Sequence, residues 1–365
     1  MGTPARFSVA KYHGIIWVMN DPGKSKSIYC LDYYEIIEFF TKQGMPEYRA
    51  RQIWKGLYQN LYDDWDSFTS LPKSLRSLLT SNFNFLPIEP QLTLFNADKS
   101  TIKVLFYLQD NSPIESVLMK SGKRWTLCLS TQSGCAMGCV FCATGKMGLQ
   151  CNLSTAEIVS QVIYFLKYLK AHKRSLTNIV FMGMGEPFNN YDPVTKAINI
   201  INDSSGINLG ARRITVSTIG IIPKIYQFSQ DQPQVNLAIS LHAPEDELRS
   251  KLVPINKKYP LSNLIAACHD YVNITHRRIS FEYILIAGVN DSLQQAKQLG
   301  HLLRNLLCHV NLIGFNPIDN TQFLAPSKIS IEKFANQLSS LGVQTTIRKS
   351  MGVNIHAGCG QLAGK

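Results

Sequence analysis

The stretch W-T-L-C-L-S-T-Q-S-G-C-A-M-G-C-V-F-C, residues 125–142, opens with a predicted strand at 125–129 and ends in three closely spaced cysteines. Further strands are predicted at 178–182, 213–217, 235–241, 278–286 and 310–315, with a last one at 343–348. Helical stretches, for example 155–170 and 292–307, separate these strands. Strands that alternate with helices in this way predict an α/β fold with a parallel sheet and right-handed crossovers.

Unusual polar and glycine residues follow each of the first six predicted strands. The cysteine motif C-A-M-G-C-V-F-C (135–142) comes after the first strand. The next five strands are followed by G-M-G-E-P (183–187), S-T-I-G (217–220), S-L-H-A-P (240–244), G-V-N-D (288–291) and F-N-P (315–317). In a β/α barrel, the loops at the C-terminal ends of the strands build the active site. Six units instead of eight predict a partial, open (β/α)6 barrel with room for a large substrate.

The rest of the chain divides into four further parts. Residues 1–30 are expected to form a loosely held leader. Residues 31–90 show helical patterns over 31–42 and 47–59, and a third helix opens at Leu71-Pro72. Residues 91–124 alternate between apolar and polar, which predicts a short antiparallel β extension. The barrel then covers 125–350, and the glycine-rich residues 351–365 are expected to form a mobile tail that carries Cys359.

Composition and charge narrow the class of protein. The 365 residues are 45% hydrophobic and 17% charged, which excludes a disordered chain. No apolar run approaches the roughly 20 residues that cross a bilayer, so we expect a cytoplasmic protein with no membrane partner. We also expect a monomer. A net charge of +12 suits a polyanion such as RNA. Basic groups that could follow a phosphate backbone are Arg212-Arg213, Lys257-Lys258, His276-Arg277-Arg278 and Arg348-Lys349.

Nine cysteines, an odd number, argue against a disulfide framework. Cys135, Cys139 and Cys142 form a C-x3-C-x2-C motif whose thiolates could converge on one metal centre. A structural zinc ion normally takes four ligands, and an electron-transfer iron–sulfur cluster usually takes four cysteines. Three thiolates on a four-iron cluster would leave one iron open for a substrate. Zinc, with Cys128 or Cys151 as the fourth ligand, is the alternative.

The cysteine triplet followed by G-M-G-E-P, S-T-I-G and S-L-H-A-P resembles the radical S-adenosylmethionine (SAM) enzymes. Cys128, seven residues before the triplet, and Cys359 in A-G-C-G-Q-L narrow the resemblance to the RlmN/Cfr methyltransferases of ribosomal RNA. The resemblance covers residues 30–365 and implies a radical SAM barrel with a [4Fe–4S] cluster on Cys135, Cys139 and Cys142. G-E-P at 185–187 is more similar to the housekeeping enzymes that methylate adenine C2 than to the C8 resistance enzymes.

The resemblance also implies a reaction in which two molecules of SAM are used per turnover. The first methylates the Cys359 thiolate, and the second is cleaved to a 5′-deoxyadenosyl radical that takes hydrogen from the S-methyl group. The carbon radical adds to an adenine of 23S ribosomal RNA, and transfer RNA is a further candidate substrate. Cys128 then helps to release the product, which leaves a Cys128–Cys359 disulfide. The electron comes from an external donor such as flavodoxin or ferredoxin.

Further site residues carry over from the same resemblance. The implied SAM contacts are Gly185, Glu186, Ser217, Ser240, Leu241, His242 and Asn316. Glu115 matches a family position assigned as a proton acceptor, and the alternative is an exposed carboxylate on a strand. His242 alone would more often be a structural histidine, and Cys359 alone an incidental thiol in a disordered tail.

Three other functions remain open at this point. The first is a C8-adenine methyltransferase of the Cfr type. The second is a radical SAM enzyme with another substrate, which an absence of RNA affinity would favour. The third is a non-catalytic RNA-binding protein with a structural zinc site, which a colourless protein with bound zinc and no iron would favour.

Overall fold

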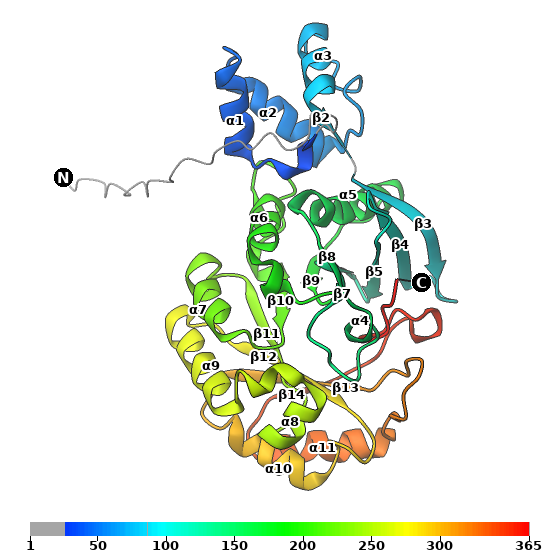
Figure 1. Cartoon of the computed structure of the whole chain (residues 1–365), viewed down its shortest axis with the longest axis vertical. Coiled ribbons are helices and arrows are strands. Elements are labelled where there is room, and N and C mark those ends of the chain that lie inside the picture. Colours follow the sequence, from blue (N-terminus) through cyan, green and yellow to red (C-terminus); the bar gives the residue numbers. More distant parts are fainter. Residues whose placement is uncertain (1–25, 86, 365) are drawn as a thin grey trace, which may run out of the picture.

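The computed structural model describes residues 26–85 and 87–364 (Figure 1), so most of the predicted leader lies outside the described residues. Residues 26–30, which were predicted to belong to that leader, are folded. β1 (Lys26–Ser27) pairs in parallel with β2 (Phe83–Asn84), and the 3-10 turn η1 (Ile28–Cys30) buries Tyr29 completely. These five residues are therefore part of the helical N-terminal domain, because they supply its core and a strand pairing.

The helical domain contains α1 (Tyr33–Lys42), α2 (Tyr48–Lys55) and α3 (Lys73–Asn82). A capping box between Asp32 and Glu35 begins α1, and α2 continues as a π-helical turn, η2 (Gly56–Asn60). The predicted helices over 31–42 and 47–59 are thus confirmed. Trp54 fastens this domain to the barrel, because its Nε1 donates a hydrogen bond of 3.1 Å to Oδ1 of Asp203.

Within the described residues, one ten-stranded sheet forms the body of the protein (Figure 1). Its strand order is β14-β13-β12-β11-β10-β9-β6-β5-β4-β3. The parallel part consists of β6 (Arg124–Cys128), β9 (Asn178–Phe181), β10 (Ile214–Thr218), β11 (Asn236–Ser240), β12 (Ile279–Leu285), β13 (Cys308–Gly314) and β14 (Thr345–Arg348). The predicted partial barrel is confirmed, with the strand expected at 343–348 as its last member.

The antiparallel part of the sheet consists of β3 (Ile88–Phe95), β4 (Thr101–Leu108) and β5 (Pro113–Ser121). β5 pairs antiparallel with β6, so the predicted β extension continues the barrel sheet. β4 is buried except at Tyr107, and β5 is buried over Ile114–Leu118 but exposed at Lys120 and Ser121. The helices of the barrel lie on one side of this part of the sheet, and the C-terminal segment lies beside it (Figure 1).

Helices on the outside of the sheet connect the parallel strands. They are α5 (Thr155–Ala171), α6 (Tyr191–Asn202), α7 (Ile222–Asp231), α8 (Asp246–Leu252), α9 (Leu261–Thr275), α10 (Leu293–Leu302) and α11 (Lys328–Ser340). Short 3-10 turns stand at η3 (Pro187–Asn190), η4 (Ala211–Arg213), η5 (Pro254–Lys257) and η6 (Val353–Ile355). Fully buried strand residues such as Ile179, Val216 and Leu237 form the core, as expected for a sheet covered by helices.

A hairpin that the sequence did not predict holds the cysteine motif. Its strands are β7 (Gln132–Cys135) and β8 (Gly148–Asn152), and α4 (Ala143–Lys146) lies between them. Gly134 has φ +70°, and a Cβ at this position would lie 1.8 Å from the carbonyl oxygen of Gly148. Only glycine fits this crossing, so Gly134 sets the point from which the cysteine loop leaves the hairpin.

Among the described residues, every helix is too short or too polar to span a bilayer.

Candidate active site

A cavity of about 150 Å³ lies at the carboxyl ends of the parallel strands. Most of the residues singled out in the sequence line it, although they come from five separate segments. These residues are Cys135, Cys139, Cys142, Gly185, Glu186, Ser217, Ser240, His242 and Cys359. Four of the six strand-end motifs therefore line one cavity, as their placement predicted, whereas G-V-N-D (288–291) and F-N-P (315–317) do not line it.

The three cysteines of the triplet lie close together, since Cys142 disfavours ionisation of Cys135, and both Cys142 and Cys135 disfavour ionisation of Cys139. Burial raises the pKa of Cys135 to about 11 and the pKa of Cys139 well above its ordinary value. Both would therefore be protonated without a positive centre to hold them as thiolates. In the part of the chain that the structure describes, no group of His, Cys, Asp and Glu side chains is arranged to hold a single metal ion.

Neither of the two cysteines considered as a fourth zinc ligand lines the triplet cavity. Cys151 is on β8, opposite Ser133 of β7, and Cys128 lines a second cavity. The triplet instead surrounds a space shared with other polar groups, which fits a polynuclear cluster with room beside it for a ligand.

The second cavity, also about 150 Å³, is lined by Cys128, Cys142, Arg348 and Cys359. Cys128 ends β6 and is 8% exposed, and burial raises the pKa of its thiol to about 12. Cys359 is exposed to the two cavities, and the removal of its thiol from bulk water raises its pKa. The structure thus places on one cavity the two cysteines that the family resemblance pairs, and both are free thiols in it.

Arg348 is a site residue that the sequence analysis assigned only to a basic surface pair. It ends β14, and its Nη1 lies 3.5 Å from Oε2 of Glu282, a buried carboxylate that also accepts a 2.8 Å hydrogen bond from Asn311. The guanidinium lowers the pKa of both Cys128 and Cys359 and so opposes the effect of burial. The sequence signal that could have identified Arg348 is its position at the end of the last predicted strand, 343–348, since the other site residues also follow strand ends.

Glu186 connects two of the strand-end loops. Its Oε2 accepts a 2.8 Å hydrogen bond from the backbone N–H of Ile219, and its Oε1 accepts one of 3.0 Å from Phe188. Burial nevertheless raises its pKa to about 7. Gly185 before it has φ +99°, and a Cβ there would lie 2.5 Å from the Cβ of Gln132, so no other residue fits.

His242 is both structurally satisfied and present in the cavity. The backbone N–H of Ile284 donates a 3.1 Å hydrogen bond to Nδ1, so the proton of the neutral ring is on Nε2. Burial lowers the pKa of His242 to about 3, which keeps the ring neutral. The ring packs edge-on against Phe141, with 4.6 Å between the ring centroids. His242 therefore offers one fixed hydrogen-bond donor.

The other predicted SAM contacts differ in their surroundings. Ser217 and Ser240 end adjacent strands, and their Oγ atoms are 3.3 Å apart in the cavity wall. Leu241 is buried in the core, where its carbonyl oxygen accepts a hydrogen bond from Arg249. Asn316 is turned towards the tail, since its Nδ2 donates a 3.0 Å hydrogen bond to the carbonyl oxygen of Cys359.

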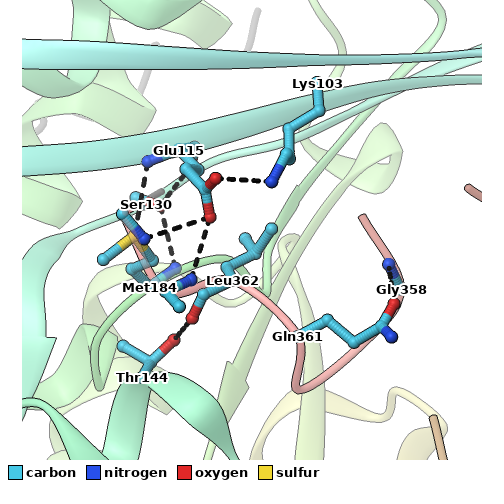
Figure 2. A network of polar contacts seen from close by, with 10 residues as sticks. Lys103, Glu115, Ser130, Thr144, Met184, Gly358, Gln361 and Leu362 are labelled. Atoms are coloured by element: carbon cyan, nitrogen blue, oxygen red, sulfur yellow. Dashed lines mark hydrogen bonds and ion pairs between the residues drawn. The ribbon is translucent and has the colours of Figure 1, made fainter. Parts of the chain in front are cut away.

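Glu115 is fully buried on β5, so the alternative of an exposed strand carboxylate is wrong. Its Oε1 lies 2.6 Å from Nζ of Lys103, and its Oε2 accepts hydrogen bonds from backbone N–H groups of the tail (Figure 2). It lines a third cavity, of about 500 Å³, together with tail residues. The proton-acceptor role expected for Glu115 stays a prediction.

Two family models match the chain. One, described as the radical SAM superfamily, matches residues 129–299. The other, described as the ribosomal RNA large subunit methyltransferase N-terminal domain, matches residues 27–84. The first covers the barrel from the loop before the cysteine triplet as far as α10, and the second covers the helical domain.

Relatives match along nearly the whole chain. A probable dual-specificity RNA methyltransferase RlmN of Staphylococcus carnosus is 46% identical over 340 residues, 93% of each chain. The protein of the same name from Staphylococcus aureus is 45% identical over 340 residues, again 93% of each chain. The crystal structure of a radical SAM methyltransferase from Sphaerobacter thermophilus is 48% identical and covers 93% of this chain and 100% of its own, with a TM-score of 0.91. The chain therefore belongs to the RlmN family of radical SAM RNA methyltransferases.

Proposed function

We propose that this protein transfers a methyl group to C2 of an adenosine in 23S ribosomal RNA through an S-methylated Cys359. One observation carries the proposal: Cys359 lines both the cavity of the cysteine triplet and the cavity of Cys128. A single thiol is thus placed to receive a methyl group on one side and to meet a second thiol on the other.

Membership of the radical SAM family implies a [4Fe–4S] cluster and SAM as cofactors, with two molecules of SAM used per cycle. Cys135, Cys139 and Cys142 would hold the cluster, whose open iron and single electron supply radical chemistry from SAM. Glu186, Ser217, Ser240 and His242 would contact SAM, because they line the same cavity.

The thiols of Cys359 and Cys128 carry out the other covalent steps. Cys359 is the methyl-accepting nucleophile, and the Arg348 guanidinium favours its thiolate form. As the product leaves, the Cys128 thiolate attacks the Cys359 sulfur. The S–S bond forms while the bond from that sulfur to the transferred carbon breaks, and the carbon keeps the electron pair and takes a proton. An external dithiol then reduces the disulfide by supplying two electrons and two protons. An electron donor such as flavodoxin or ferredoxin serves the cluster.

RNA as the substrate is supported by the net charge of +12 and by the N-terminal domain, whose family description names a ribosomal RNA methyltransferase. The target adenine must leave its stack to reach Cys359. Transfer RNA is proposed as a second substrate, since the relatives are called dual-specificity enzymes. The proposed enzyme is a monomer and acts in the cytoplasm, where ribosomal RNA is found.

Expression in a host that lacks its own enzyme of this kind is expected to restore 2-methyladenosine in 23S ribosomal RNA. Mass spectrometry of nucleosides from purified ribosomal and transfer RNA, with and without this protein, measures it. Appearance of 8-methyladenosine would reassign the protein to the C8 enzymes. Neither product, despite a reconstituted cluster, would refute RNA methylation and leave a radical SAM enzyme with another substrate.

SAM binding is expected to release a proton from Glu186. Without ligand its pKa is raised to about 7, and the positive charges of SAM favour the carboxylate, so binding lowers that pKa. Affinity should therefore fall as the pH drops below about 7, by up to about tenfold per pH unit. Calorimetry at a pH near that pKa, in two buffers of different ionisation enthalpy, counts the protons. Glu186→Gln should release none, and equal release by both proteins would exclude Glu186 as the source.

A further inference from the structure

The C-terminal segment around Cys359, expected to be mobile, is bound along its length. The backbone N–H of Ala143 donates to the carbonyl oxygen of Gly360 (2.8 Å), and Oγ1 of Thr144 donates to that of Leu362 (2.6 Å). Nε2 of Gln361 donates to the carbonyl oxygen of Pro317 (2.8 Å). Together with the Asn316 contact to Cys359, these bonds define what we call the docked tail, residues 358–364.

The docked tail ends on a buried ion pair. Oε2 of Glu115 accepts hydrogen bonds from the N–H groups of Ala363 (2.9 Å) and Gly364 (3.3 Å), while Oε1 contacts Lys103 (Figure 2). The Glu115 side chain is 0% exposed and the Lys103 side chain 5%. A buried carboxylate needs both a counter-charge and hydrogen-bond donors. Lys103 supplies the charge, and the tail supplies the donors for Oε2.

Glu115 is itself held in place by the active-site loops. Oγ of Ser130 donates a 2.5 Å hydrogen bond to the carbonyl oxygen of Glu115 and accepts one of 2.8 Å from the N–H of Met184. The N–H of Glu115 lies 3.3 Å from Sδ of Met184. Figure 2 shows these contacts of Ser130 and Met184 with Glu115. Met184 directly precedes Gly185 and Glu186 of the cavity wall, so the backbone of Glu115 is bonded to the loop that forms that wall.

We propose that Glu115, with Lys103 as its counter-charge, is a positioning residue that fastens the docked tail and so places the Cys359 thiol between the two cavities. Cys359 lies four residues before Ala363, and the intervening residues are tied to Thr144 and Pro317. Among the described residues, Glu115 is the charged side chain that binds Ala363 and Gly364. Loss of these hydrogen bonds would therefore release the C-terminal end of the docked tail. The use of Cys359 in catalysis rests on the proposed function, but the docking does not.

Thr144 provides an independent way to loosen the same segment. Its hydroxyl binds Leu362, next to the residues that bind Glu115, and it has no acid–base chemistry at neutral pH. If tail position is what matters, Thr144→Val and Glu115→Gln should act alike. A residue whose role is proton transfer alone has no reason to share a phenotype with Thr144→Val.

The test measures the tail directly, without cofactors or RNA. Amide hydrogen exchange and the alkylation rate of Cys359 are followed by peptide mass spectrometry in the wild type, Glu115→Gln, Glu115→Asp and Thr144→Val. Glu115→Asp keeps the charge beside Lys103 but shortens the reach to the tail, so it guards against misfolding of Glu115→Gln. Loss of hydrogen bonds to a charged group is expected to speed exchange at Ala363 and Gly364 by about tenfold or more. Glu157→Gln, in the capping box of α5, is the matched control and should exchange like the wild type.

A second readout separates positioning from proton transfer. With the cluster reconstituted and SAM added in the absence of RNA, Cys359 should be methylated more slowly in Glu115→Gln, Glu115→Asp and Thr144→Val than in the wild type. Wild-type exchange and wild-type Cys359 methylation in both Glu115 variants, with only RNA methylation lost, would overturn the positioning role. If the variants exchange their tail amides faster but Cys359 is not methylated even in the wild type, the proposed function is refuted and the docking of the tail by Glu115 stands.

Discussion

Replacing Cys359 with alanine is expected to abolish RNA methylation, a loss of about 10⁴-fold or more, as for other covalent nucleophiles. Cys359 lines both the triplet cavity and the Cys128 cavity. Cys142 is the other cysteine that lines both, and we assign it to the cluster. Cys359 is therefore the thiol that lines both cavities and is left to carry the methyl group. Transfer of labelled methyl groups from SAM to RNA measures the effect.

The same variant should keep its cluster and its fold. Iron and sulfide content, the visible absorption of the cluster and thermal unfolding should match those of the wild type. Cys151→Ala is the matched control, because Cys151 lies on β8 away from both cavities. It should keep both cluster and activity. Loss of iron from Cys359→Ala would make Cys359 a cluster ligand instead, and normal methylation would exclude it from the reaction.

Replacing Cys139 with alanine is expected to remove the cluster and, with it, all activity. Cys139 is 8% exposed, and its ionisation is disfavoured by both Cys135 and Cys142, so the three thiols face one centre. Two remaining thiolates cannot hold a four-iron cluster that already has one open iron. Iron content should fall from about four atoms per chain in the reconstituted wild type to near zero, as measured by metal analysis.

The Cys139 experiment also decides between iron and zinc. A wild-type protein that holds one zinc ion and no iron after anaerobic reconstitution would contradict the cluster. In that case Cys139→Ala would lose zinc, and the RNA-binding alternative would gain support. Retention of full iron content by Cys139→Ala would show that the triplet is not the ligand set.

Much of the barrel could be predicted because its signals are local. The predicted strand at 178–182 is observed as β9 (Asn178–Phe181), and that at 213–217 as β10 (Ile214–Thr218). Apolar runs of this length are buried on both faces, and the glycine and polar residues that end them stand at the loops. The hairpin β7–β8 escaped prediction because its strands are short and polar and depend on Gly134 for their crossing.

The burial of Glu115 and the role of Arg348 could not be predicted in the same way. Glu115 accepts a hydrogen bond from Ala363, which lies 248 residues later in the chain. Arg348 contacts Glu282, which lies 66 residues earlier. Neither contact produces a periodic pattern. The glycines of the tail suggested mobility, whereas the structure uses Gly360 at φ +84°, where an added Cβ would lie 3.2 Å from the carbonyl oxygen of Phe141.

The sequence by itself determined the barrel, the cysteine triplet and the meeting of the strand-end motifs. The triplet lies within one loop, and parallel strands bring their carboxyl ends to one edge of the sheet whatever their distance in sequence. Only the tertiary structure decided where the Cys359 thiol stands, that Lys103 balances Glu115, and that Arg348 faces both reactive cysteines. These features depend on which side chains pair with each buried charge, and the paired side chains come from segments that lie far apart in the chain.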